Sequence, residues 1–69
     1  MERVPVSSTN VAAIGYDEDT EILEIEFTNG AVYQYFGVPS GEFNGFMGSD
    51  SKGKFFNANI KNRYSVSKL

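Results

Sequence analysis

Two short segments of alternating apolar and polar residues flank Thr28-Asn29-Gly30, with the sequences LEIEF (residues 23–27) and AVYQYF (residues 31–36). Apolar residues at every second position place one row of side chains on one face of a β-strand. Asn-Gly between two such runs is a strong short-range signal for a tight turn. The pattern therefore predicts a β-hairpin over residues 21–38.

The register of this hairpin depends on the length of its loop. A two-residue turn would pair Phe27 with Val32, whereas a three-residue loop with a left-handed Gly30 at a bulge pairs Phe27 with Ala31. The second register separates the side chains by polarity, with Leu23, Ile25, Phe27, Tyr33 and Tyr35 on one face and Glu24, Glu26 and Gln34 on the other. We predict the second register, because it exposes the glutamates to water.

A third strand is predicted before the hairpin. Residues 10–16 (NVAAIGY) suit a strand packed closely on its neighbour, with Gly15 marking a bulge or a tight approach. Neighbours in sequence are usually neighbours in space, so the three strands form an antiparallel meander. Its strands lie at about 10–16, 21–28 and 31–38. Residues 1–9 form an irregular or edge-like lead-in, from which we expect Val4 and Val6 to reach inward.

Beyond Pro39 the spacing of apolar residues lengthens, which indicates a change from strand to helix. Phe43, Phe46 and Met47 lie three and four residues apart, on one face of a helix of about two turns. Ser40 is a good N-cap for this helix, because a serine hydroxyl can accept a hydrogen bond from a free backbone N–H group.

A second helix is predicted to open at residues 49–51 (SDS). Phe56, Ile60 and Tyr64 recur at every fourth residue within it, so this apolar stripe faces the sheet. Residues 65–69 carry no periodicity, and we expect them to fray or to lie along the surface.

These elements predict a single α+β domain over residues 1–69, with its core at about 4–64. A three-stranded antiparallel meander is followed by two short C-terminal helices that pack on one face of the sheet. So short a chain buries only about 60% of its unfolded surface and has little room for an enclosed cleft. Six Phe and four Tyr supply large buried areas for a small core.

Residue types that are absent narrow the range of functions. The sequence has no Cys and no His, which removes disulfides, thiolate nucleophiles, the commonest transition-metal ligands and the usual acid–base group at neutral pH. No stretch approaches the length of a membrane span, and the first residues do not resemble a signal peptide. We therefore expect a non-enzymatic, cytoplasmic monomer without a cofactor, a metal site or a membrane segment.

The charges divide the chain into two parts. Residues 1–50 hold all nine acids and a single base (−8), whereas residues 51–69 hold five bases and no acid (+5). Lys52 and Lys54 fall in the first turn of the predicted second helix, where they oppose the helix dipole. They indicate an anion site there, with Lys61 one heptad beyond Lys54 on the same side. An ordinary solvated basic face is the alternative.

Three other patterns resemble known functional motifs but lack a residue or an environment that the motif requires. Residues 48–54 (GSDSKGK) match the first seven positions of a phosphate-binding P-loop, but Phe55 stands where Ser or Thr must bind magnesium. Residues 17–21 alternate like a calcium loop but lack the glycine of its sharp turn. Glu24 and Glu26 share one open strand face, where we expect solvated carboxylates rather than a catalytic pair.

Several short motifs resemble one family. They are IGYD at 14–17, NG at 29–30, YQY at 33–35, VP at 38–39 and SKGKFFN at 51–57. With these motifs the chain resembles the KTSC domain over about residues 4–64. That family is named for a C-terminal extension of some lysyl-tRNA synthetases and also occurs as small stand-alone proteins of bacteria and phages. Its Y-x-Y centre matches Tyr33 and Tyr35. Ser49 stands where the family favours Ala, which would loosen the packing between the helices.

The family has no established activity. An RNA-binding role has been suggested for it from the synthetase context, and the resemblance implies the same expectation here. We therefore expect a small binding module that favours RNA. Its phosphate contacts would come from five basic side chains, Lys52, Lys54, Lys61, Arg63 and Lys68. Tyr33 or Tyr35 would stack on bases only if they face solvent. The alternative is a protein-interaction module that uses an exposed sheet edge or an aromatic surface. Buried tyrosines would favour this alternative over RNA binding.

Overall fold

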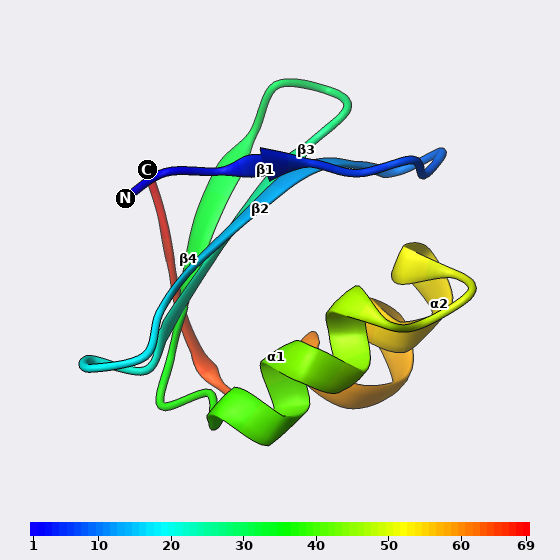
Figure 1. The fold of residues 1–69 in the computed structure, drawn as a ribbon. Helices are drawn as coiled ribbons and strands as arrows, with labels where there is room; N and C mark the ends of the chain where they lie inside the picture. Colours follow the sequence, from blue (N-terminus) through cyan, green and yellow to red (C-terminus); the bar gives the residue numbers. More distant parts are fainter.

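A computed structural model describes residues 1–69 as one antiparallel sheet with helices packed on its concave face (Figure 1). The strands, in the order β1-β2-β3-β4-β5 across the sheet, are β1 (Val4–Pro5), β2 (Val11–Asp17), β3 (Ile22–Phe27), β4 (Val32–Phe36) and β5 (Ser65–Lys68). The helices are α1 (Ser40–Met47) and α2 (Lys52–Phe55), and α2 continues into a π-helix, η1 (Phe56–Ile60). The α+β class and the packing of the helices on one face are as predicted.

The hairpin of β3 and β4 has the predicted three-residue loop. Phe27 N–H donates to the Ala31 carbonyl over 2.8 Å, and Gly30 N–H donates to the Phe27 carbonyl over 2.9 Å. Gly30 has φ +92°, a region that a residue with a Cβ rarely adopts. Ile25 therefore pairs with Tyr33, and the predicted register is confirmed.

The sheet has two more strands than the predicted meander, one at each edge. β1 pairs with β2, and β5 pairs with β4. Residues 65–69 do not fray, since Leu69 N–H donates to the Val32 carbonyl over 2.8 Å, and they lie along the surface as a paired strand. The sequence carries no sign of β5 because all four of its side chains are exposed and its pairing uses backbone groups alone. Val4 is also 54% exposed rather than inward, because β1 lies at the other edge.

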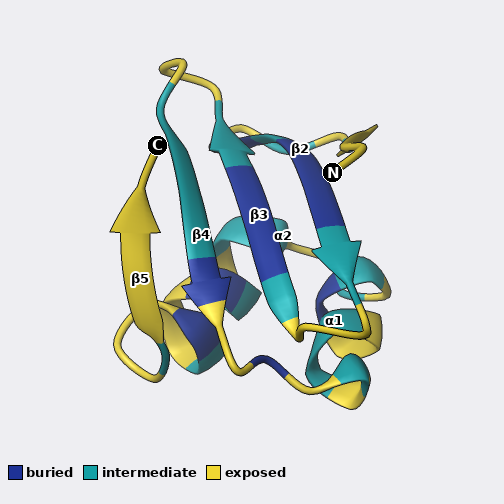
Figure 2. Cartoon of the chain, turned by 90° about the vertical axis from the view of Figure 1, so that its left-hand side faces the viewer, coloured by how far each residue is buried: buried dark blue, intermediate teal, exposed yellow.

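One hydrophobic core lies between the sheet and the helices. Its nine buried members are Val11, Ile14, Leu23, Ile25, Tyr35, Val38, Phe46, Phe56 and Ile60. Figure 2 shows that burial is concentrated in β2 and β3 and that β5 is exposed along its length. Phe56 and Ile60 are in the core, as their spacing predicts.

The helix ends differ from the prediction in two places. Pro39, not Ser40, occupies the cap position of α1, and no side chain caps that helix. Proline suits this position because it has no N–H group to leave unpaired. The second helix ends at Ile60, so Tyr64 lies beyond it and reaches the core from the following turn. Lys61 N–H donates to the Phe56 carbonyl, five residues back, which is the hydrogen bond of a π turn.

Candidate functional site

The two tyrosines of the YQY motif lie on the helix-facing side of β4. Tyr35 is 5% exposed, and its ring meets the Phe56 ring edge-on at 5.5 Å between centroids. Tyr33 is half-buried and meets Phe27 edge-on at 5.7 Å. Burial raises the pKa of the Tyr35 hydroxyl, and the neighbouring Tyr33 raises it further. Tyr35 is a core residue that a base cannot reach, so the base-stacking hypothesis does not extend to it.

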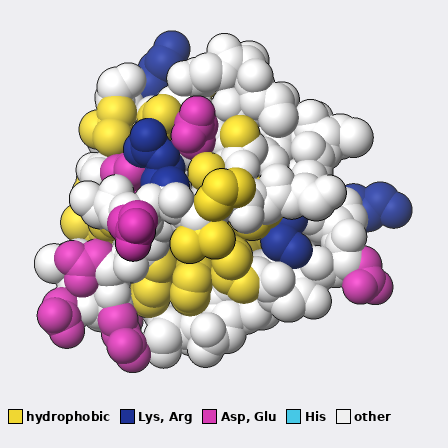
Figure 3. Space-filling model, turned by 45° about the horizontal axis from the view of Figure 1, so that its top comes forward, with side chains coloured by type: hydrophobic (Ala, Val, Ile, Leu, Met, Phe, Trp, Pro, Cys, Tyr) yellow, Lys and Arg dark blue, Asp and Glu magenta, His cyan; other side chains and the backbone are white.

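The basic side chains are distributed over several elements. Lys52 Nζ donates to the Ser49 carbonyl over 2.8 Å, so one of the two lysines of α2 is already engaged. Lys54 and Lys61 are exposed and make no ion pair, whereas Arg63 lies 3.8 Å from Glu42. The Lys and Arg side chains visible in Figure 3 stand apart from one another, while several acidic side chains gather at the lower left of that face.

The expected alignment of Lys61 with Lys54 assumed a continuous α-helix, and the π turn of η1 rotates Lys61 out of that heptad position. Lys68 lies on β5 opposite Tyr33. Phosphate binding by these five basic side chains stays a prediction.

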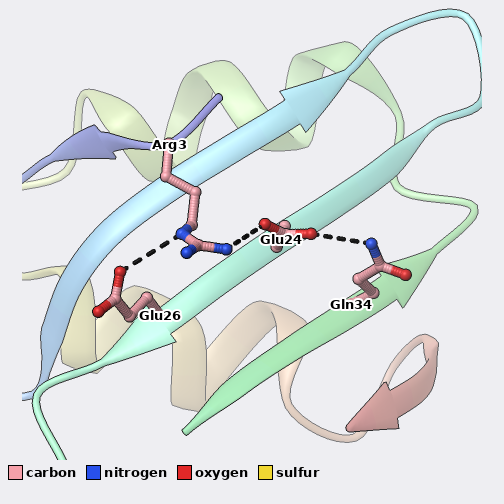
Figure 4. A network of polar contacts seen from close by, with 4 residues as sticks. All are labelled: Arg3, Glu24, Glu26 and Gln34. Atoms are coloured by element: carbon pink, nitrogen blue, oxygen red, sulfur yellow. Dashed lines mark hydrogen bonds and ion pairs between the residues drawn. The ribbon is translucent and has the colours of Figure 1, made fainter. Parts of the chain in front are cut away.

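A polar network covers part of the convex face of the sheet (Figure 4). Arg3 Nη1 donates to Glu24 Oε2, and Arg3 Nε lies 3.3 Å from Glu26 Oε1. Gln34 Nε2 donates to Glu24 Oε1 over 2.8 Å. Glu24 is only 5% exposed, so the expectation of a solvated carboxylate is wrong at this position. The N-terminal segment crosses the sheet here and brings Arg3 onto Glu24.

Gly15 makes that crossing feasible. A Cβ at Gly15 would lie 2.7 Å from the backbone carbonyl oxygen of Glu2, closer than real contacts allow. The predicted tight approach at Gly15 is therefore confirmed, and the bulge of β2 lies instead between Val11 and Ala13.

The charge state of Glu24 follows from its surroundings. Burial alone would raise its pKa, but the hydrogen bonds from Gln34 and Arg3, the Arg3 charge and the N-terminal ammonium group together lower it. Glu24 is therefore ionised at neutral pH and holds no proton to donate. It acts as an anchor for the N-terminal segment rather than as a general acid.

A cavity of about 410 Å³ opens between the start of β2, the hairpin loop and the second helix. Its lining consists of eight residues, Asn10, Val11, Phe27, Thr28, Asn29, Gly53, Phe56 and Asn57. The buried floor is apolar and the exposed rim carries amides and a hydroxyl, with no charged side chain among the lining residues. Sequence reasoning missed this site, although Gly53, Phe56 and Asn57 all belong to the SKGKFFN motif.

A second, shallower hollow lies beside the turn between β2 and β3 and is rimmed by acidic residues 17–19. No group of acidic side chains in the structure is arranged to hold a metal ion. None of the helices has the length and apolar character needed to cross a lipid bilayer.

Comparison with known proteins identifies the family. The KTSC domain model matches residues 7–64. The crystal structure of a KTSC domain protein from Yersinia pestis is 45% identical, with a TM-score of 0.94 over 99% of this chain and 96% of that chain. An uncharacterised protein of Stutzerimonas stutzeri is 39% identical over 88% of this chain and 86% of its own length. A lysine–tRNA ligase of Nostoc punctiforme is 36% identical over 86% of this chain but only 10% of the ligase. The chain belongs to the KTSC domain family.

Proposed function

We propose that this domain is a protein-interaction module that binds an extended, acidic segment of a partner along β5. The observation that carries the proposal is the open edge of the sheet at this strand. An edge strand presents unpaired backbone N–H and C=O groups, onto which another chain can add as a further strand.

The unpaired groups of β5 can be assigned from its pairing with β4. Leu69 N–H donates to the Val32 carbonyl, and successive backbone groups of a strand alternate in direction. Ser65 and Ser67 therefore face β4, whereas the N–H and C=O groups of Val66 and Lys68 face away from the sheet. The Val66 side chain is 49% exposed, which adds an apolar contact for an added strand.

The opposite edge of the sheet is less suited to strand addition. β1 has only two residues, and its second residue, Pro5, has no backbone N–H group. Val6 N–H donates to the Ala12 carbonyl and so faces into the sheet. A partner strand therefore finds a continuous set of donors and acceptors at β5 and not at β1.

The charge around β5 indicates the chemistry of the partner. Lys68 lies on the strand, Lys61 and Arg63 lie in the turn before it, and residues 51–69 contain no acid. An acidic segment would gain from these charges, whereas a second copy of β5 would bring like charges together. Tyr35 is buried and Tyr33 is half-buried, which reduces the aromatic surface available for base stacking. This burial supports a protein partner rather than RNA at this sheet.

The experiment is a chemical-shift titration with an extended peptide of alternating valine and glutamate. At about 1 mM peptide, a range suited to weak strand contacts, the amide signals of β5 should move, and a valine–lysine peptide should move them less. Val66→Pro removes an outward N–H group without removing a bond to β4, so it should abolish binding. Val66→Thr keeps both the N–H group and the β-branched shape and should bind normally. Unmoved β5 signals, or equal binding by Val66→Pro, would refute the proposal.

A further inference from the structure

The cavity beside the second helix has the size of a small-ligand site, with an apolar floor and a polar rim. Its volume of about 410 Å³ lies in the range of about 300–1,000 Å³ typical of ligand pockets. The floor is formed by Val11, Phe27 and Phe56, and the two aromatic rings meet edge-on at 5.3 Å between centroids. None of the lining residues belongs to β5, so this site is separate from the proposed strand-addition edge.

The rim carries hydrogen-bonding groups that the fold itself does not use. The side-chain amides of Asn10 and Asn57 make no hydrogen bond to another group of the chain. By contrast, the Asn59 amide on the same helix donates to the Phe55 carbonyl over 3.2 Å. Asn29 Oδ1 accepts from Ala31 N–H, which leaves the amino group of Asn29 free. Each of the Asn10 and Asn57 amides offers a donor NH2 group and an acceptor carbonyl oxygen side by side.

The cavity walls are uncharged, and one basic side chain starts next to the lining. No carboxylate lines the cavity, so an anion would meet no repulsion from the walls. Lys54 is exposed, follows the lining residue Gly53 and lies one helical turn before the lining residue Asn57. Lys54 does not itself line the cavity, but its flexible side chain starts next to the lining residue Gly53, so its free ammonium group is within reach of a ligand group that leaves the mouth.

We propose that this cavity binds a nucleotide, with the base held in the cavity and the phosphate at Lys54. Asparagine amides match the adjacent donors and acceptors at the edge of a base. The apolar and aromatic floor suits the flat face of a heterocycle. A nucleotide is the ligand class that combines such a heterocycle with one anionic group at the required end. It is either a free nucleotide or one unit of a single strand, since both present the same chemistry.

Gly53 provides a sharp test because its Cβ would point into the site. A methyl group there would lie 3.2 Å from Asn10 Nδ2, so the amide must shift by a few tenths of an ångström. Alanine is otherwise favoured over glycine in a helix. Gly53→Ala should therefore maintain or raise the stability of the fold while it weakens ligand binding. This variant separates loss of binding from loss of structure.

The experiment is a chemical-shift titration with the four nucleoside 5′-monophosphates, ribose 5-phosphate and a single-stranded RNA tetranucleotide. We expect the side-chain amide signals of Asn10 and Asn57 to move with nucleotides but not with ribose 5-phosphate, and the backbone signals of α2 to move much more with nucleotides than with ribose 5-phosphate. Tighter binding of the tetranucleotide at the same signals identifies a strand as the source, and equal affinity identifies the free nucleotide. Response to ribose 5-phosphate equal to that of the nucleotides would overturn the proposal, because it would show anion binding alone.

The variants add an independent check. Asn57→Leu and Gly53→Ala should each weaken nucleotide affinity by about three- to tenfold, the effect of one or two lost hydrogen bonds. Lys54→Gln should weaken the binding of a nucleotide but not that of the corresponding nucleoside. Lys61→Gln is the matched control, because it makes the same charge change at a residue whose chain neighbours do not line the cavity, and it should weaken neither. Absence of shifts at cavity residues with every probe at about 10 mM, a concentration that detects even weak ligands, or unchanged affinity in Asn57→Leu and Gly53→Ala, would overturn the proposal.

Discussion

Replacing Arg3 with methionine should destabilise the domain at neutral pH. Methionine keeps an apolar stem over Gly15 but removes the guanidinium group that faces Glu24. The Glu24 carboxylate would then stay almost fully buried with Gln34 as its remaining side-chain partner. Breaking a fully buried ion pair costs about 3–5 kcal/mol, and the Arg3 side chain is 34% exposed, so we expect a smaller loss of about 1–3 kcal/mol.

The loss should depend on pH in a defined direction. The pKa of Glu24 is lowered in the folded state, so its carboxylate contributes stability above the unfolded pKa of about 4 and loses it as pH falls through the folded pKa. Arg3→Met removes part of what lowers that pKa, while the burial that raises it remains. The difference in unfolding free energy between the two proteins should therefore be largest near neutral pH and should shrink in acid.

Urea denaturation followed by tyrosine fluorescence, at neutral pH and in acid, measures this difference. Glu26→Gln is the matched control, because it removes the more exposed ion pair of Arg3 and should cost less than about 1 kcal/mol. In a Glu24→Gln background, Arg3→Met should cost little. An unchanged midpoint in Arg3→Met at neutral pH, or an equal loss at both pH values, would show that this network does not stabilise the fold.

Two further variants test the hairpin and the second helix. Gly30→Val should cost about 1–2 kcal/mol through backbone strain alone, since nothing lies within 4 Å of its Cβ, whereas Gly41→Ala, equally uncrowded but with no positive φ, should not destabilise. Equal denaturation midpoints for Gly30→Val and the parent would contradict the left-handed turn. Ile60→Ala should cost about 2–5 kcal/mol, enough to unfold much of a domain this small, and a native-like thermal transition would argue against its burial.

The elements that could be predicted are those whose sequence pattern and structural cause are both local. Alternation and Asn-Gly determine the hairpin, and only one loop length puts the polar face of β3 on the side away from the helices. The four-residue spacing of Phe56 and Ile60 likewise reports burial directly. β5 has no such pattern, because an exposed strand can pair through its backbone whatever its side chains are.

The functional surfaces were harder to predict because they join residues that are distant in sequence. Alternation assigns Glu24 to the convex face correctly, but nothing near Glu24 indicates that Arg3 covers it. Gly15 was the available sign, since a glycine within a strand often marks the approach of another segment. The cavity joins Asn10 to Asn57, and its polar rim becomes visible only when β2 and the second helix are brought together.

The position of β5 in the chain also affects the order in which the sheet is assembled. β3 and β4 meet across a short loop, whereas β5 reaches β4 only after both helices have been traversed, so its pairing closes a much longer loop. Non-local pairings of this kind form late, and an exposed edge with few buried contacts opens readily. β5 is therefore expected to be the last strand to join and the first to detach. A chain that adds to its outer edge would bind only the closed form, so partner binding and completion of the sheet would be thermodynamically coupled.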